Sequence, residues 1–278
     1  MANRHKGEIP VTGSLDNEYK ARHESFERWF QSSLGRAMLA NQRHVLDQAT
    51  APLTGARQLQ VGLSHRLPLA SGSDFVQKII TTPGWHAHMP DSVAVADADE
   101  LPFPGDSMDL VILHHTADFS PDPHQVLRES ARVLRGEGKI ALIGFNPVSL
   151  WGLRKLVSRH HEGPWGGRFL FRKRMEDWLR LLGFQIDDSA THFCALPLQN
   201  NRGHRRTRQR NRDWLPIGAY YCILARKRVV GRVPPRARWQ KAKVMPIPGT
   251  LGAPGGCASR SGTMSNNRKQ QEKQWPAR

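Results

Sequence analysis

The chain has 278 residues, 38% of them hydrophobic, which is enough for one large or two small domains with a buried core. Its formal net charge of +17 comes entirely from residues 202–278, where 19 basic residues face 2 acidic ones, whereas residues 1–201 hold 22 of each. The three cysteines share no CxxC spacing, and no run reaches the roughly 18 apolar residues of a membrane span. These features argue against a disulfide framework and a membrane-spanning protein, and the lack of an apolar signal core predicts a cytoplasmic one.

Residues 15–49 carry the first regular pattern. From Phe26 to Leu46, apolar residues recur at intervals of three, four and seven between charged residues, which predicts one long helix or two short ones. The sequence ARQLQVGLS then predicts a first strand that ends at Gly62, and residues 75–81 predict a short second strand.

Residues 93–147 give the strongest signal in the chain. VAVAD, MDLVILHH and GKIALIGF are short apolar runs of the kind that form buried parallel strands, and the third is entered through a turn at Gly136-Glu137-Gly138. Between the second and third runs, Pro123 to Leu134 has helical apolar spacing with charges on the remaining positions. This order predicts a βαβ unit with a right-handed crossover.

The remaining elements follow in the C-terminal part. Residues 174–182 repeat the helical spacing, and Gly183 is placed to cap that helix. GFQIDDSATHFCAL and GAYYCILARK predict two antiparallel edge strands, joined by a basic loop at 199–216.

Three segments result from these elements. Residues 1–55 form an N-terminal helical segment, and residues 56–229 form a doubly wound α/β domain with a mostly parallel sheet of six or seven strands and an antiparallel final strand. Residues 230–278 form a basic tail whose composition is typical of disorder.

In an open parallel sheet the ligand binds beyond the carboxyl ends of the strands. Asp97, residues 113–115 and residues 145–147 each follow or end a predicted strand. We therefore expect all three to border one crevice, which is the predicted site.

The central segment resembles a known family. ADADELPFPGDSMDLVILHH is similar to the signature of the type 11 group of class I S-adenosylmethionine-dependent methyltransferases, in which an acidic residue follows the third strand, before an LPF turn and a D-h-V strand. DPHQVLRESARVLRGEGKIALIGFNP continues the similarity, and GFNPVSLWGLRK and LANQRHVLDQA resemble a small bacterial subfamily. The resemblance covers about residues 20–229 and is strongest over 93–155.

The resemblance implies a seven-stranded Rossmann-like fold, S-adenosylmethionine as cofactor, and methyl transfer to an unidentified acceptor, which we expect to be a small molecule. It also implies roles for individual residues. The Asp97 carboxylate would accept from the exocyclic amine of adenine, and the backbone of Ala98 would donate to the same ring. Gly62 would mark the turn near the methionine moiety, and Leu113 and His114 would line the pocket beneath the sulfonium.

The first motif departs from the family pattern. The family has a glycine-rich loop after strand one, whereas this chain reads QVGLSHRLPLA and retains Gly62 alone. Gln60 stands where an acidic residue is usual, and Ser64 and Arg66 stand where glycines are usual. No acidic residue ends the second strand, where the family carries its ribose-binding carboxylate. Cofactor binding is therefore reshaped, weakened or lost.

His114 and His115 admit two interpretations. A histidine at a strand end could act as a general base, since its unperturbed pKa is near 6.5. With strand alternation one of the two faces the interior, where it would be a core residue. The other histidine pairs have no acidic or thiol partner at metal-ligand spacing, so no metal site is expected.

The basic loop has the composition of a weak nucleic-acid contact. Its arginines are Arg202, Arg205, Arg206, Arg208, Arg210 and Arg212. Two alternatives to a small-molecule methyltransferase therefore remain open: a noncatalytic protein that binds RNA or another polyanion through this loop, and an RNA methyltransferase that holds its substrate there. A solvated charged loop is the third interpretation of the same residues.

Overall fold

The computed structural model describes all residues except 1–12, 86–87, 158–161, 195–217 and 230–278. The fold is a seven-stranded sheet with the order β3-β2-β1-β4-β5-β7-β6. Its strands are β1 (Thr54–Val61), β2 (Asp74–Thr82), β3 (Val93–Val95), β4 (Met108–His114), β5 (Leu134–Phe145), β6 (Phe184–His192) and β7 (Tyr220–Lys227). The pairs among β1 to β5 are all parallel, and β7 runs antiparallel to β5 and β6. The predicted α/β fold with an antiparallel final strand is confirmed.

The helices are α1 (Gly13–Trp29), α2 (Ser33–Thr50), α3 (Thr116–Phe119), α4 (Pro123–Val133), α5 (Leu150–Val157) and α6 (Arg172–Leu181), with a 3-10 turn η1 (Gly163–Gly166). The two-helix alternative for residues 15–49 is the correct one, because the Ser32 hydroxyl accepts from the Gly35 amide and starts a new helix. Gly183, at φ +85°, follows α6 as predicted.

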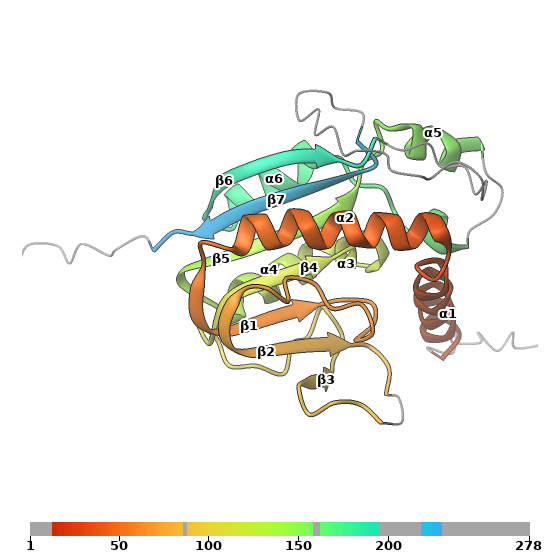
Figure 1. Ribbon diagram of the computed structural model, residues 1–278. Helices are drawn as coiled ribbons and strands as arrows, with labels where there is room; N and C mark the ends of the chain where they lie inside the picture. Colours follow the sequence, from red (N-terminus) through yellow and green to blue (C-terminus); the bar gives the residue numbers. More distant parts are fainter. Residues whose placement is uncertain (1–12, 86–87, 158–161, 195–217, 230–278) are drawn as a thin grey trace, which may run out of the picture. The chain divides into compact units, whose positions relative to one another are not determined.

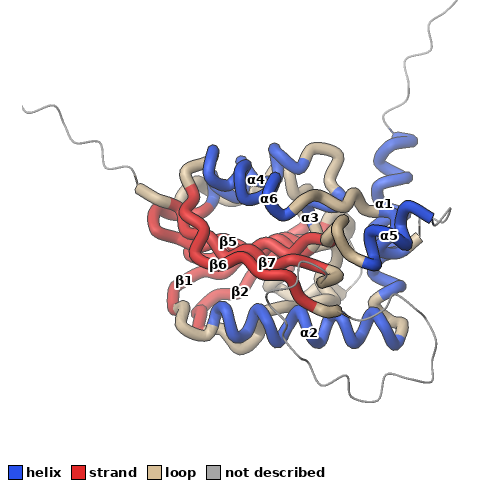
Figure 2. Tube along the Cα trace, turned by 90° about the horizontal axis from the view of Figure 1, so that it is seen from above, coloured by secondary structure: helices blue, strands red, loops and turns tan. Residues whose placement is uncertain are grey.

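Helices cover both faces of the sheet. Figure 2 shows α4 and α6 on one face and α2 on the other. Alternation along β4 divides the core accordingly: Leu110 and Ile112 pack with α2, whereas Val111 and Leu113 pack with α4 and α6.

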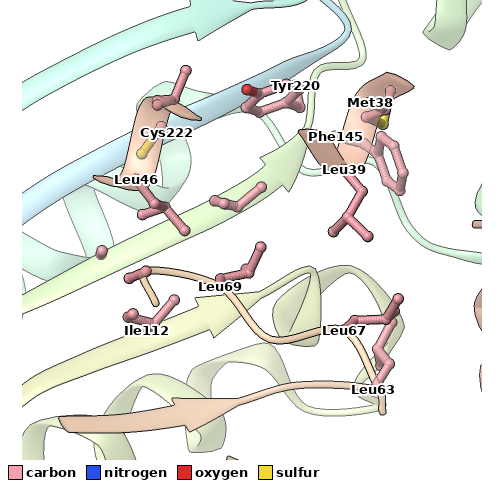
Figure 3. Packing of buried hydrophobic residues seen from close by; sticks show 14 of the residues in the cluster. Met38, Leu39, Leu46, Leu63, Leu67, Leu69, Ile112, Phe145, Tyr220 and Cys222 are labelled. Atoms are coloured by element: carbon pink, nitrogen blue, oxygen red, sulfur yellow. The ribbon is translucent and has the colours of Figure 1, made fainter. Parts of the chain in front are cut away.

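The connection from β1 to β2 contains no helix. Residues 62–73 instead fold back beneath α2 and bury Leu63, Leu67 and Leu69 in the same cluster as Met38, Leu46 and Ile112 (Figure 3). A parallel pair commonly has a crossover helix at this place. Here α2, which precedes β1 in the chain, supplies the helical cover.

Two details of the predicted strands are wrong. The turn at Gly136-Glu137-Gly138 lies inside β5 as a bulge, because Met108 pairs with Leu134 and Leu110 already pairs with Lys139. Strand β7 is not an edge strand, since it lies between β5 and β6. Its buried residues on both faces, from Tyr220 to Ala225, are typical of an interior strand.

Candidate functional site

The register of the parallel strands brings the predicted site residues to one edge of the sheet. Val61 pairs with Leu113, so Gly62 and His114 follow neighbouring strand ends. On the other side of β1, Thr82 of β2 pairs with Val95, which places Asp97 just beyond the same edge. The order β1-β4 is also where the sheet changes its winding direction, the usual place for a ligand crevice.

The loop after β3 holds Asp97 and Ala98 in a fixed turn. The Ala96 amide donates to the Thr82 carbonyl at 3.0 Å, and the Glu100 amide donates to the Asp97 carbonyl at 3.3 Å. Ala98 is buried in the core, whereas the Asp97 side chain is exposed. The carboxylate therefore lies at the surface of the edge while the adjacent backbone is anchored.

A second set of contacts ties this loop to α4. The Leu101 amide donates to the Glu129 carboxylate at 3.2 Å, and the Arg132 guanidinium donates to the Leu101 carbonyl at 2.9 Å. Arg132 also pairs with Glu129 at 2.8 Å, and this hydrogen bond lowers the pKa of the Glu129 carboxyl. The loop is thus held by a charged pair on the crossover helix.

The loop after β1 is organised by Gln60. Its side-chain amide donates to the Leu67 carbonyl at 2.9 Å, and its side-chain oxygen accepts from the Leu69 amide at 2.8 Å. A carboxylate at this position could make the second bond but not the first, because it has no donor. Gln60 is buried. Glutamine in place of the usual acid therefore supplies the donor that helps to hold residues 62–73 in their helix-free conformation.

Gly62 is the residue of this loop that leaves room at the edge. A Cβ atom built there would meet nothing closer than the Gln60 amide nitrogen at 3.5 Å, an ordinary contact. Packing within the chain does not require glycine at this position. Gly62 is buried, and its lack of a side chain would let a ligand approach its backbone closely.

The end of β2 carries Thr81 and Thr82, both buried. The Thr81 hydroxyl donates to the Gln60 carbonyl at 3.4 Å, within the sheet. No carboxylate occupies this strand end, as the sequence indicated. A ribose would therefore have to be held by other groups than in the family pattern.

His114 and His115 at the end of β4 are both buried, and neither faces solvent. His114 continues the alternation of the strand towards α2, where its ring lies 5.7 Å from that of Phe30. His115 leaves the strand with φ +54°, a left-handed conformation that turns its ring inward as well. At least one of the two was expected to be a core residue, and both are, because this backbone turn breaks the alternation.

A chain of buried hydrogen bonds joins the two histidines to α2 and α3. His115 Nδ1 lies 2.9 Å from Asp118 Oδ2, His115 Nε2 lies 2.8 Å from Gln42 Nε2, and Gln42 Oε1 lies 3.0 Å from His114 Nε2. Because the Gln42 amide nitrogen must donate, His115 Nε2 accepts and His115 Nδ1 donates to Asp118. His114 in turn donates from Nε2, which leaves Nδ1 as its acceptor atom.

Burial governs the charge of these groups. It lowers the pKa of His115 to about 3 and holds the pKa of His114 well below 6.5, where His115 and Arg43 lower it further. Burial raises the pKa of Asp118, while the Phe145 amide and Lys155 act in the opposite direction. Both imidazoles are therefore neutral near pH 7, and His115, bonded through both nitrogens, is a core histidine.

Leu113 does not point into the crevice. Its side chain is fully buried in the cluster beneath α4 and α6, on the sheet face opposite His114. Only its backbone lies at the edge next to Gly62. A contact of Leu113 with the cofactor stays a prediction, and the backbone of Leu113 would have to make it.

Aromatic side chains surround the carboxyl ends of β4 and β5. Phe26 of α1 lies 5.4 Å from the His115 ring and 5.7 Å from that of Phe145, and Trp29 meets Trp151 of α5 at 5.7 Å. Phe26 is fully buried, whereas Trp29 is half-buried. Helix α1 thus packs across this end of the sheet, beside the arrowheads of the parallel strands in Figure 1.

A cleft of about 340 Å³ lies between α1 and the loop after β1. It is lined by Glu24, Glu27, Arg28, Gln31 and Arg66. Arg66 Nη1 reaches Glu27 Oε1 at 3.3 Å and so bridges the two elements. Two carboxylates and two guanidiniums therefore line one opening.

Within the described residues, no group of three histidine, cysteine or acidic side chains is arranged to hold a metal ion. None of the helices described is both long and apolar enough to span a membrane. The six arginines of the predicted nucleic-acid contact lie outside the described residues, and their role stays a prediction.

Sequence reasoning missed several residues of this region. Gln42 sits on the apolar stripe of its helix, four residues from both Met38 and Leu46, and a polar residue there could have indicated a buried partner. Glu27 gave no signal, because its pairing with Arg66 depends on how α1 lies against the loop.

Comparisons with known proteins agree on the type of domain. Residues 70–142 match the family described as a methyltransferase domain. An uncharacterized protein of Escherichia coli, YafS, is 38% identical over 136 residues, which is 49% of this chain and 55% of that protein. A 2-methyl-6-phytyl-1,4-hydroquinone methyltransferase of Arabidopsis thaliana is 34% identical over 34% of this chain and 26% of that protein. The chain thus spans about half of the first relative and a quarter of the second.

The fold has counterparts among solved structures. An S-adenosylmethionine-dependent methyltransferase of Thermotoga maritima, described as a possible histamine N-methyltransferase, superposes with a TM-score of 0.54 over 76% of this chain and 99% of that one. The sequence identity is 17%, so this similarity concerns the fold.

Proposed function

We propose that this chain is a methyltransferase of the type 11 group of class I S-adenosylmethionine-dependent enzymes, because residues 70–142 match the methyltransferase domain family and the fold has a counterpart in such an enzyme. From that premise we propose that it transfers a methyl group from S-adenosylmethionine to a small-molecule acceptor. The observation that carries the proposal is the edge of the sheet beside β1 and β4, where Gly62, Asp97 and His114 are brought together by strand register. The order of the seven strands puts that edge at the switch point of the fold.

The residues at the edge fit the cofactor. The exposed Asp97 carboxylate can accept from the adenine amine, and the adjacent Ala98 backbone is anchored in the core where it can donate to the ring. The bare backbone of Gly62, where a Cβ would make ordinary contacts at 3.5 Å and beyond, suits the close approach of the methionine part. The backbone of Leu113 and His114 lies at the strand edge between these two ends.

When bound, S-adenosylmethionine supplies a methyl group that its positive sulfur already activates. The work of the protein is then to align the acceptor and to exclude water, and a catalytic side chain is optional. His114 and His115 are buried and neutral, so they add no charge at this edge of the sheet. His115 is unsuited to act as a general base, since both of its nitrogens are already bonded.

The acceptor side supports a small molecule. Half-buried aromatic residues, Trp29 of α1, Trp165 of η1 and Phe169, pack around Trp151 and Phe145 beyond the ends of β4 and β5. Such a wall offers apolar, ring-stacking contacts and few donors, which suits a compact organic acceptor better than a polyanion.

The test uses S-adenosylmethionine labelled in its methyl group, incubated with the full chain and either a small-molecule extract of bacterial cells or their total RNA. We expect label in the small-molecule fraction. Label in RNA would replace the proposal by an RNA methyltransferase, in which the arginines between 202 and 212 would hold the substrate. No transfer to either fraction, together with no cofactor binding, would favour the noncatalytic polyanion-binding protein.

A further inference from the structure

The first motif departs from the glycine-rich pattern at residue 66, and the side chain introduced there lines a cleft. Arg66 stands at a position where the family carries glycine, and its side chain is 60% exposed in the cleft between α1 and the loop after β1. A bare backbone is thus replaced by a guanidinium that reaches into the opening. Its partner Glu27 is only 16% exposed, so the pair is anchored on the α1 side.

The residues that flank Glu27 in the chain show which part of the sheet the α1 side of the cleft touches. Phe26, the preceding residue, packs on the His115 ring, and Phe30, three residues further on, packs on that of His114 at 5.7 Å. Helix α1 therefore touches the end of β4 while Glu27 reaches Arg66 on the loop that leaves β1. The cleft is thus lined by α1 and the residues just after it on one side and by Arg66, four residues after Gly62 in the chain, on the other.

The charges of the cleft are balanced. Glu24 and Glu27 supply two carboxylates, Arg28 and Arg66 two guanidiniums, and Gln31 an uncharged amide. A guanidinium has five N–H donors, and among the described contacts Arg66 uses its side chain for one hydrogen bond, to Glu27. It can therefore receive a carboxylate without giving up that partner. A ligand that carries one positive and one negative group close together would complement this set.

We infer that this cleft binds the zwitterionic amino-acid end of S-adenosylmethionine, with Arg66 receiving the α-carboxylate and Glu27 the α-ammonium group. The inference rests on the proposed function, because it assigns residues to that cofactor. It explains how a loop with Gly62 as its one retained glycine can hold the methionine part: two side chains perform the task that backbone amides perform in a glycine-rich loop.

Two ligands that differ in one part test the assignment. S-adenosylhomocysteine carries the amino-acid end, whereas 5′-methylthioadenosine keeps the adenosine and the thioether and lacks that end. We expect calorimetric titration of the full chain to give at least a tenfold higher affinity for S-adenosylhomocysteine. Arg66→Gln should lower the affinity for S-adenosylhomocysteine about tenfold and leave that for 5′-methylthioadenosine unchanged, because a charge-assisted hydrogen bond is lost.

Glu27→Gln should also lower the affinity for S-adenosylhomocysteine and leave that for 5′-methylthioadenosine unchanged, with a smaller loss than Arg66→Gln. Arg36→Gln, at an exposed position of α2, is the matched control and should change neither affinity. Equal affinities of the unaltered chain for the two ligands would overturn the inference while leaving the proposed function in place. An equal loss of both affinities in Arg66→Gln would also overturn it, since Arg66 would then act on the loop and not on the amino-acid end. If neither ligand binds, the proposed function fails as well.

Discussion

The two halves of the sheet on either side of the β1/β4 boundary connect their strands in different ways. Between β4 and β5 the chain crosses over through α4, whose apolar side is buried beneath β4. Between β1 and β2 it crosses through residues 62–73, which contain no helix and are covered by α2. The β4–β5 half thus keeps the family pattern in both sequence and connection, whereas the β1–β2 half departs from it in both.

The largest effect is expected where α1 meets the β4–β5 half. Phe26→Ala removes a fully buried ring that contacts Phe30, Phe119 and Phe145, and it should lower the free energy of unfolding by about 3–5 kcal/mol. Chemical denaturation of the full chain measures this loss. Phe171→Ala, at a side chain that is 57% exposed, is the control and should cost far less. Equal losses in both variants would show that α1 does not pack as described.

A smaller effect tests the helix-free half. Gln60→Glu restores the acidic residue usual in the family, but it removes the donor to the Leu67 carbonyl and buries a charge. The variant should therefore lose about 2–3 kcal/mol of unfolding free energy, measured by denaturation. Gln77→Glu, at an exposed position of β2, provides the control. A neutral or stabilising Gln60→Glu would contradict the proposed role of Gln60 in shaping the loop.

The third effect concerns cofactor affinity on the adenine side. Asp97→Ala should weaken binding of S-adenosylhomocysteine about tenfold, roughly 1.4 kcal/mol, because the acceptor for the adenine amine is lost. Its exposed side chain predicts little change in unfolding free energy. Calorimetry on Asp97→Ala and on the neighbouring Glu100→Ala separates a specific from a general charge effect. Unchanged affinity in Asp97→Ala would remove the adenine from this loop.

The smallest effect is a pH dependence. Burial lowers the pKa of His23 in α1 to about 4, so the unfolded chain binds a proton near pH 6.5 that the folded chain refuses. The contribution of His23 to stability is complete above pH 6.5 and decreases as the pH falls towards 4, by about 1 kcal/mol between pH 7 and 5.5. His114 and His115 act in the same direction, whereas the raised pKa of Asp118 acts in the opposite one.

Because several groups titrate together, the informative quantity is a difference. Between pH 7 and 5.5 the unaltered chain should lose about 1 kcal/mol more unfolding free energy than His23→Phe, which lacks the titrating group. Parallel curves would mean that His23 is solvated in the folded protein.

The sequence predicted the fold because its strands and helices carry strong local patterns. The apolar runs of β4 and β5 and the spacing of α4 identify a βαβ unit without any knowledge of contacts. The position of β7 inside the sheet was not predicted, because the sequence pattern of two paired apolar strands does not show which of them forms the edge.

The site was predictable only in part. Asp97 and Ala98 follow β3 at the sheet edge, as their motif predicted, and their contact with adenine stays a prediction. The inward turn of His115 depends on a left-handed backbone conformation, which cannot be predicted from a non-glycine residue in the sequence. The Glu27–Arg66 pair joins residues 39 positions apart and exists only because α1 packs over the strand ends.

The most direct test of the central claim is a calorimetric titration of the full chain with S-adenosylmethionine. Binding in the micromolar range, roughly −8 kcal/mol, is the predicted result and would mean that the reshaped loop after β1 still holds the cofactor. The absence of heat and of thermal stabilisation at millimolar cofactor would contradict the proposed methyl transfer.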